Sequence, residues 1–205
     1  MNRVAAVVLA GGRGERLGGA VKANLVIGGI RLLDRVVAAL GDLPAPILLA
    51  HGAISPRDLG ASETLVPVPD LAADYAGPIA GLAGAVAWCL AADTPPELLL
   101  TVAVDTPFVP AGFASGMIEA ARGHEAVIAA HHGQRYPTNA VWRLSAVADL
   151  PGRLHNATSP RSLMRLAESL GAPSLDWPEI VGGDPFANAN TPADLEALEA
   201  RARTG

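Results

Sequence analysis

Five glycines and three basic residues lie within one short stretch of the sequence. The glycines are Gly11, Gly12, Gly14, Gly18 and Gly19, and the basic residues are Arg13, Arg16 and Lys22. Glycine permits positive φ and lets bare N–H groups approach a ligand, and successive N–H groups form a concavity suited to anions. The stretch follows residues 4–9, an unbroken apolar run that predicts a strand buried on both faces. Because open α/β sheets bind ligands beyond the carboxyl ends of their strands, we predict a phosphate-binding loop rather than a surface turn.

A single carboxylate follows the most apolar strand that the sequence predicts. Residues 98–104 form that strand, and Asp105 stands directly before a turn at Thr106 and Pro107. Mg²⁺ prefers oxygen ligands and is commonly held by one or two carboxylates together with substrate phosphates. Asp105 is therefore a candidate Mg²⁺ ligand, although aspartate is also common in turns and both interpretations stay open. Asp70 and Asp74 are rival carboxylates in a longer loop.

The composition favours a small anionic ligand over nucleic acid or a membrane surface. The 205 residues carry a formal charge of −5, so no general basic field exists to hold DNA or anionic lipid. Aromatic residues make up only 4% of the chain, which leaves few platforms for stacked bases. The one cysteine, Cys89, excludes an internal disulfide, and we expect it to be buried and inert within its apolar run. The longest uncharged run is interrupted by glycine and proline, so we expect a soluble cytoplasmic protein.

The elements that must position these residues alternate between strand and helix. Short apolar runs predict strands at residues 46–50, 65–68, 98–104 and 126–130, and apolar residues at helical spacing predict helices at 31–40, 79–92 and 111–122. Pro67 and Pro69 favour an edge position for the strand at 65–68. The alternation predicts an α/β fold, a Rossmann-like three-layer α/β/α arrangement with helices on both faces of one sheet. The length suggests a single domain over residues 1–205.

The second half of the chain departs from this alternation. A turn at Gly133 and a returning strand at residues 136–142 predict one antiparallel strand, and therefore a mostly parallel, mixed sheet. Helical segments follow at 144–150 and 160–170, with a short strand at 174–177. Thr191 has the features of a helix N-cap, since Pro192 follows it and Asp194 lies three residues on. The last helix is expected at residues 192–202.

Five motifs in the same order resemble those of Rossmann-like nucleotidyltransferases, in particular the molybdenum cofactor guanylyltransferases. They are Leu9-Ala-Gly-Gly with Arg16, Gly18-Gly19 and Lys22; Asp74-Tyr-Ala-Gly-Pro-Ile-Ala-Gly81; Val104-Asp-Thr-Pro107; Tyr136-Pro-Thr138; and Asn188-Ala-Asn-Thr-Pro192. Each is a weak match alone, but the ordered series is specific and spans nearly the whole chain. The resemblance implies transfer of GMP from GTP to the terminal phosphate of molybdopterin-bound molybdenum, with release of pyrophosphate and a requirement for Mg²⁺. It also implies transient contact with proteins of cofactor biosynthesis or molybdoenzyme maturation, and no nucleic-acid or membrane partner.

The resemblance further implies roles for individual residues. The nucleotide would be lined by Leu9, Ala10, Gly11, Gly12, Lys22, Asp70 and Asp105, with Mg²⁺ on Asp105. Arg16 and Lys22 would act with Asp105 in catalysis, because they can stabilise the charge that develops on pyrophosphate. The acceptor would lie near Gly77, Pro78, Tyr136, Pro137, Asn188 and Asn190. Asn188 and Asn190 also suit a turn before a helix, and that alternative stays open.

Three positions depart from the family pattern. Val21 stands where an acidic residue usually precedes the lysine, Ala50 and His51 stand where an asparagine often ends the second strand, and Arg31 replaces a common proline. Two alternatives to guanylyl transfer therefore stay open. One is a nucleotidyltransferase of the same fold that uses CTP or a sugar phosphate, and the other is a catalytically silent nucleotide-binding partner of a biosynthetic enzyme. Leu-Ala-Gly-Gly favours GTP, since cytidylyl relatives tend to carry Leu-Ala-Ala-Gly.

Overall fold

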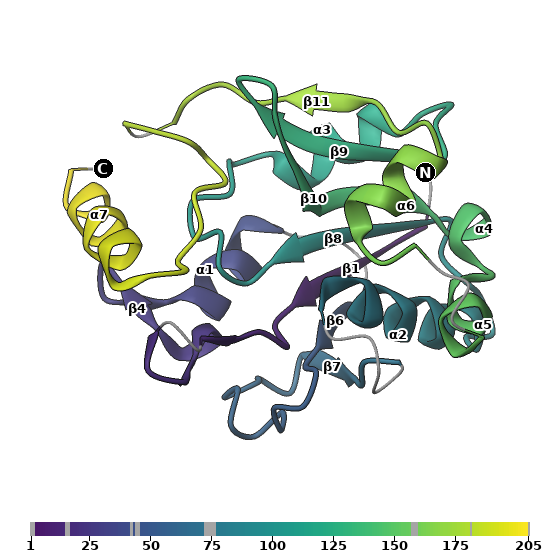
Figure 1. The fold of residues 1–205 in the computed structure, drawn as a ribbon, viewed down its shortest axis with the longest axis horizontal. Helices are drawn as coiled ribbons and strands as arrows, with labels where there is room; N and C mark the ends of the chain where they lie inside the picture. The colour runs from purple at the N-terminus through teal and green to yellow at the C-terminus, as the bar shows by residue number, and fades with distance from the viewer. Residues whose placement is uncertain are drawn as a thin grey trace.

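A seven-stranded sheet lies at the centre of the computed structural model (Figure 1). Its strands are β1 (Val4–Leu9), β6 (Ile47–Ala50), β7 (Leu65–Val68), β8 (Leu98–Ala103), β9 (Ala126–His131), β10 (Gln134–Arg143) and β11 (Ser174–Asp176). They lie side by side in the order β11-β9-β10-β8-β1-β6-β7. The structure describes residues 3–14, 17–41, 43, 46–71, 77–156, 160–180 and 182–204.

Parallel pairing dominates this sheet. β1 pairs in parallel with β6 and β8, β6 with β7, and β9 with β11. β10 runs antiparallel between β8 and β9, which confirms the predicted mixed sheet. β7 lies at an edge of the sheet, as predicted. Pro67 has no N–H to donate, and an edge strand has no second neighbour that would need one.

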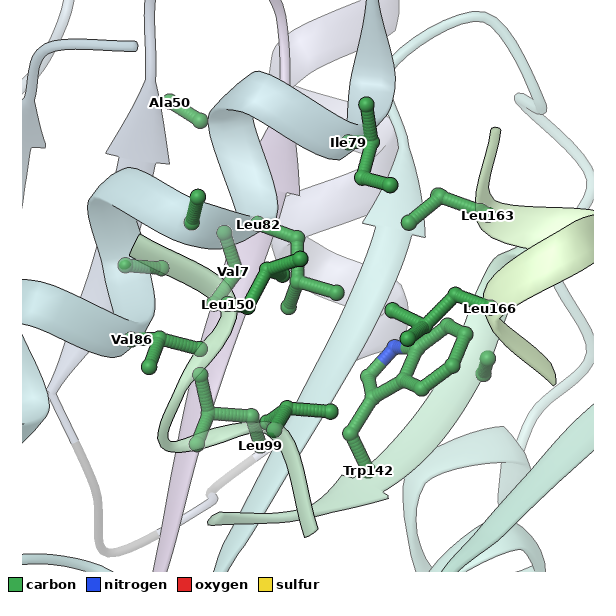
Figure 2. Packing of buried hydrophobic residues seen from close by; sticks show 14 of the residues in the cluster. Val7, Ala50, Ile79, Leu82, Val86, Leu99, Trp142, Leu150, Leu163 and Leu166 are labelled. Carbon is green, nitrogen blue, oxygen red and sulfur yellow. The ribbon is translucent and has the colours of Figure 1, made fainter. Parts of the chain in front are cut away.

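Helices cover both faces of the sheet, as the alternation predicts. On one face lie α2 (Pro78–Leu90), α4 (Leu144–Val147), α5 (Leu150–His155) and α6 (Leu163–Ser169). Figure 2 shows Leu82 and Val86 of α2 packed over the strands in this core. Cys89 is buried in the same core, and burial raises the pKa of its thiol to about 12, so the expectation of a buried cysteine is confirmed. A thiol with so high a pKa stays protonated and unreactive at neutral pH.

The opposite face is covered by α1 (Leu32–Ala39) and α3 (Phe113–Ala120). Alternate residues of β1 serve the two cores, with Val7 on the side of α2 and Val8 on the side of α1 and α3. This explains why the first strand is apolar at every position rather than at alternate ones. Within the described part of the chain, no helix has both the length and the apolar content needed to cross a membrane.

Small elements connect β1 to the rest of the fold. They are β2 (Arg13–Gly14), β3 (Ala20–Val21), the 3₁₀ helix η2 (Lys22–Asn24), β4 (Val26–Ile27) and β5 (Ile30–Arg31). The last helix, α7 (Pro192–Ala202), packs against β4 (Figure 1). Their contact is a third apolar cluster, whose buried members are Ile27, Leu32, Ala189 and Leu198. Gly28 and Gly29, with φ of 58° and 77°, form the turn between β4 and β5, and sequence periodicity predicted neither two-residue hairpin.

One predicted helix is shorter than expected, and a helix that was not predicted follows it. The segment predicted at 144–150 is α4, which ends at Val147, and α5 begins at Leu150 after a break at residues 148–149. Pro151 explains the break, because proline has no N–H to donate to Val147 and its ring clashes with that carbonyl. Proline is well suited to the first turn of a new helix, and α5 begins accordingly at Leu150.

Candidate functional site

The register of the sheet brings three loops to one level at its carboxyl edge. Leu9 pairs with Ala50 of β6 on one side and with Ala103 of β8 on the other. Backbone pairing continues beyond it, since Ala10 N–H donates to the Ala50 carbonyl (2.8 Å) and Val104 N–H to the Leu9 carbonyl (3.2 Å). The glycine loop, the loop after β6 and the turn after β8 therefore start side by side. We call the space beyond this edge, where open α/β sheets bind ligands, the crevice.

Lys22 and Asp105 meet at this edge. Lys22 Nζ lies 2.6 Å from Asp105 Oδ2 and donates a second hydrogen bond to Asn190 Oδ1 at 2.5 Å. The exposed fractions of the two charged side chains are 13% for Lys22 and 17% for Asp105. Because both side chains are largely shielded from water, this ion pair is screened less than one on the surface. It is therefore stronger than a surface ion pair. Two residues predicted to be catalytic, which are 83 positions apart, thus lie in direct contact.

Local structure fixes the backbone at Lys22. The residue opens η2, and its carbonyl accepts a hydrogen bond from Leu25 N–H (3.0 Å). Its neighbour Ala23 is fully buried in the core under α1. Lys22 is also the only lysine of the chain, which otherwise uses arginine as its cation. An ammonium is a compact point charge with three rotatable donors, so it can serve two oxygens at once and turn toward a phosphate.

The segment before α7 brings Asn190 to this pair. Ala189 is buried, and its N–H donates to the Asp105 carbonyl (3.0 Å). Asn190 N–H donates to Asp194 Oδ2 (3.1 Å), and Thr191 and Asp194 complete a reciprocal capping box. The predicted N-cap at Thr191 is therefore confirmed, and its geometry also places the Asn190 side chain. Asn188, its partner in the motif, is exposed.

The glycine loop meets the loop after β6 at the level of the backbone. A Cβ atom at Gly11 would lie 2.9 Å from Gly52 Cα, and one at Gly52 would lie 2.9 Å from Gly11 Cα. Neither position can hold a side chain without moving the other loop. Gly18 and Gly19 have φ of 69° and 79°, so they supply the left-handed turn between β2 and β3. Gly12 is exposed with open space around it, which leaves room for a ligand against the backbone.

Asp70 closes the other side of the crevice. Its Oδ1 accepts a hydrogen bond from Gly52 N–H (3.0 Å). Burial raises the pKa of the Asp70 carboxyl, and the Gly52 hydrogen bond and the nearby His51 oppose that rise. Helix α2 packs tightly behind it, since a Cβ at Gly81 would lie 3.0 Å from Ala50 Cβ. The predicted nucleotide residues Leu9 to Gly11 and Asp70 are thus joined through Gly52.

The residues predicted to bind the acceptor lie in two places. Gly77 and Pro78 are exposed at the first turn of α2. Tyr136 is half-buried, and its hydroxyl donates to Asp184 while its ring centroid lies 5.1 Å from that of Phe186. Burial and the Asp184 carboxylate both raise the pKa of Tyr136, so this phenol stays protonated. Its contacts hold the segment that leads to Asn190, and Pro137 follows it in the irregular stretch of β10.

The oxygens of Asp105 and Asn190 converge on one cation, the Lys22 ammonium. Carboxylate and amide oxygens are the hard donors that Mg²⁺ binds, usually few in number and completed by phosphates and water. The donor set at this edge therefore fits the expected metal. Within the described residues, no three His, Cys, Asp or Glu side chains form a group that could hold a metal ion.

Some predicted positions lie outside the described residues. Arg16 is one of them, as are residues 74–76 of the second motif, including Asp74. Conversely, sequence reasoning did not single out Gly52. The signal was present, because Gly52 stands two residues after β6 as Gly11 stands two residues after β1.

Comparisons with known proteins show the family of the chain. Residues 6–172 match the family model of the MobA-like NTP transferase domain. The molybdenum cofactor guanylyltransferase of Acidiphilium cryptum is 35% identical over 95% of this chain and 93% of its own length. That of Rhodobacter capsulatus is 34% identical over 98% of this chain and 97% of its own length.

Solved structures share the fold at lower sequence identity. Molybdopterin-guanine dinucleotide biosynthesis protein A from Archaeoglobus fulgidus superposes with a TM-score of 0.73 at 22% identity, covering 98% of this chain and 100% of that one. A 2-C-methyl-D-erythritol 4-phosphate cytidylyltransferase from Thermus thermophilus reaches 0.64, also at 22% identity, covering 99% and 100%. These two structures show that the chain shares its fold with nucleotidyltransferases. The family is shown by the family model and by the sequence relatives. The chain belongs to the family of MobA-like NTP transferase domains.

Proposed function

We propose that this protein transfers GMP from GTP to the terminal phosphate of a molybdenum-bearing molybdopterin. The observation that carries the proposal is the contact of Lys22, Asp105 and Asn190 at the carboxyl edge of β1 and β8. This contact brings a positive charge and two oxygen donors together at the end of a glycine loop. The names of the sequence relatives, molybdenum cofactor guanylyltransferase, support the choice of nucleotide and acceptor.

The reaction is a phosphoryl-type substitution at the α-phosphorus of GTP. An oxygen of the acceptor phosphate forms a bond to that phosphorus, while the bond to the bridging oxygen breaks and pyrophosphate leaves with its electron pair. Such chemistry needs positioning and neutralisation of charge rather than a protein nucleophile. When bound, Mg²⁺ supplies neutralisation between phosphate oxygens, and Asp105 with Asn190 would hold it.

Each side chain then has a defined task. Lys22 can exchange its contact with Asp105 for a phosphate oxygen and stabilise the charge that forms on pyrophosphate. Gly11 and Gly12 present backbone against the nucleotide, and Asp70 with Gly52 forms the far wall of the crevice. Asn188 is exposed near the same edge, where the acceptor phosphate would approach. The setting that we propose is cytoplasmic, with transient contact to proteins that supply or receive the cofactor.

A metal titration of three proteins tests this assignment. Asp105→Asn keeps the size of the side chain and removes its charge, so the protein is expected to fold while GMP transfer collapses. Asp70→Asn is expected to retain the Mg²⁺ midpoint of the wild type even where its turnover falls. Product formation is followed as pyrophosphate release and as the dinucleotide mass, with GTP, CTP and ATP offered in parallel.

The outcomes separate the competing functions. Wild-type activity and Mg²⁺ response in Asp105→Asn would make Asp105 a turn residue. Faster turnover with CTP would move the protein to a cytidylyl reaction on the same fold. Binding of GTP without pyrophosphate release, in the presence of a loaded acceptor, would identify a silent nucleotide-binding partner.

A further inference from the structure

A fully buried asparagine lies behind the Asp105 turn. Asn139 of β10 is 0% exposed, and its Oδ1 accepts a hydrogen bond from Ala103 N–H at 2.9 Å. Ala103 is the last residue of β8, two positions before Asp105. The side chain of a neighbouring strand thus holds the point at which the Asp105 turn begins.

The irregularity in β10 creates this arrangement. Regular pairing of β10 with β8 ends at Ala140 and Thr101, and the pairing with β9 shifts between Tyr136 and Ala140. The β10 backbone therefore does not meet Ala103 N–H, and the Asn139 side chain meets it instead. A bulge of this kind typically redirects a side chain near a functional site.

Thr106 holds the other end of the same turn. Its Oγ1 donates to the Ala103 carbonyl at 2.8 Å and lies 3.5 Å from Asn139 Oδ1. Thr106 is fully buried as well. Asn139 and Thr106 together hold both polar groups of Ala103, so the backbone on either side of Asp105 is fixed before a ligand arrives.

Asn139 also lowers the stability of the folded protein. Its Nδ2 is buried and has no hydrogen-bond partner among the described residues. An unmet buried donor lowers stability, and an apolar residue of similar size would avoid that loss. When a residue beside a proposed active site lowers stability in this way, a role in function is the expected reason for its presence.

We propose that Asn139 is a positioning residue for Asp105, acting with Thr106 on the end of β8. The inference rests on the proposed role of Asp105 and extends it to a buried residue of a neighbouring strand, β10. Positioning residues behind a metal ligand typically change metal affinity or activity by about 10- to 100-fold when removed. The loss is expected in kcat and in the Mg²⁺ midpoint, with KM for GTP changed by less than about twofold, since the binding loops stay in place.

The experiment compares four variants with the wild type. Asn139→Ala and Thr106→Val each remove one contact to Ala103, and Thr106→Ser restores the hydroxyl. Thr101→Val is the matched control, because Thr101 is fully buried and bridges the same two strands, through Ala140 and Trp142, without touching the turn. Thermal stability, Mg²⁺-dependent GTP binding, turnover and hydrogen exchange of the peptide containing Ala103 are measured on each. If Asn139→Ala does not fold, Asn139→Ser replaces it.

The inference expects faster exchange at the turn, a raised Mg²⁺ midpoint and lowered kcat in Asn139→Ala and Thr106→Val, but near-wild-type values in Thr106→Ser. Thr101→Val is expected to lose stability alone. Unchanged exchange and Mg²⁺ response in Asn139→Ala overturn the inference, as does an equal functional loss in Thr101→Val. If the wild type binds Mg²⁺ and GTP but does not transfer GMP, the proposed function is wrong. The exchange and binding data on the variants then still test the role of Asn139.

Discussion

At the scale of single residues, Lys22 makes the contacts on which the proposed chemistry depends. Its ammonium bridges two oxygens from distant parts of the chain, Asp105 Oδ2 near its middle and Asn190 Oδ1 near its C-terminus. A shielded charge needs such partners, because desolvation without compensation is costly. The same contacts can be exchanged for phosphate oxygens at little loss, since one set of charge-assisted hydrogen bonds replaces another. Lys22 is therefore suited to a role that requires both a stable resting position and movement.

Replacing Lys22 tests that role directly. Lys22→Ala is expected to slow turnover by about 100-fold or more, because it removes a charge-assisted contact to the leaving phosphate. Since Lys22 is the only lysine, an amine-directed acetylating reagent can modify only this side chain and the α-amino group. Mg²⁺ with GTP is expected to slow acetylation of Lys22, measured by mass spectrometry, and to leave the α-amino group unaffected. Near-normal turnover of a folded Lys22→Ala protein would remove Lys22 from the phosphate site.

Asp70 makes a prediction about pH. Burial raises its pKa, so the folded protein retains the proton to higher pH than the unfolded chain does. The ionised carboxyl therefore lowers stability above the raised pKa, and this effect is absent below the unfolded value of about 3.9. Asp70→Asn keeps an oxygen for Gly52 N–H and is expected to exceed the wild type in stability by an amount that grows from about pH 4 upward.

Urea unfolding from pH 4 to 8 measures that difference, with Asp58→Asn as the control at an exposed carboxyl. A gap that shrinks with rising pH would show that the Gly52 hydrogen bond outweighs burial. The same Asp70→Asn protein is expected to bind GTP more weakly while its Mg²⁺ midpoint stays that of the wild type, so stability and nucleotide binding move in opposite directions.

Sequence reasoning could identify the site residues whose side-chain type and position in a motif already indicate their chemistry. Lys22 follows a glycine loop and Asp105 follows a buried strand, so both were predicted, and the structure places them in contact. Asn139 could not be found in this way. Its role depends on a shift of register in β10, which no local pattern announces, and on the Ala103 N–H that this shift leaves for it.

At the scale of elements, the contact between α2 and the end of β7 shapes the crevice. A Cβ atom at Gly84 of α2 would lie 2.1 Å from the Pro69 carbonyl oxygen, so helix and backbone touch there. Pro69 directly precedes Asp70, and Leu71 N–H donates to the Ala80 carbonyl of the same helix (3.1 Å). The position of Asp70 is therefore set by how closely α2 approaches the sheet.

Gly84→Ala is expected to destabilise the protein by about 1–3 kcal/mol, because the added methyl must push α2 and the Pro69 segment apart. It is also expected to weaken nucleotide binding, since Asp70 moves with that segment. Gly152→Ala in α5 is the matched control, because nothing lies within 4 Å of its added Cβ. That variant is expected to gain about 0.5–1 kcal/mol from helix propensity alone. Equal stability of the two variants in chemical denaturation would contradict the close approach.

The types of the elements could be predicted because their hydrophobic periodicity is strong. Their first and last residues could not be predicted as well. The buried strands and the amphipathic α1 agree with the predicted segments within a few residues. The hairpins β2–β3 and β4–β5 escaped, since two-residue strands are too short to show a period of two. The division of α4 from α5 could have been predicted from Pro151, which acts on a carbonyl four residues earlier.

At the scale of the whole molecule, the site joins a segment near the start of the chain to one near its end. Lys22 and Asn190 are 168 positions apart, yet they share a hydrogen bond. Phe186 leads into the Asn190 segment and is fully buried, with its ring centroid 5.9 Å from that of Phe113 in α3. The matched family domain ends at residue 172, so this closing segment lies beyond it. A ligand at Lys22 would therefore stabilise contacts across the complete chain.

Thermal unfolding with ligands tests this closure and the nucleotide preference together. A ligand that binds only the folded state at 100 times its Kd adds about 2.7 kcal/mol, which for a chain of this size raises Tm by about 5–10 °C. Mg²⁺ with GTP is expected to give such a shift and CTP and ATP a smaller one, because the proposed reaction uses GTP. The open space at Gly12 leaves room for a base larger than that of CTP. Asp105→Asn is the control and is expected to lose the Mg²⁺-dependent part of the shift. Asn190→Ala should also shift less than wild type, since it removes the side chain through which the last segment reaches Lys22. A larger shift with CTP would contradict the guanine preference, and an undiminished shift in Asn190→Ala would separate the final segment from the nucleotide site.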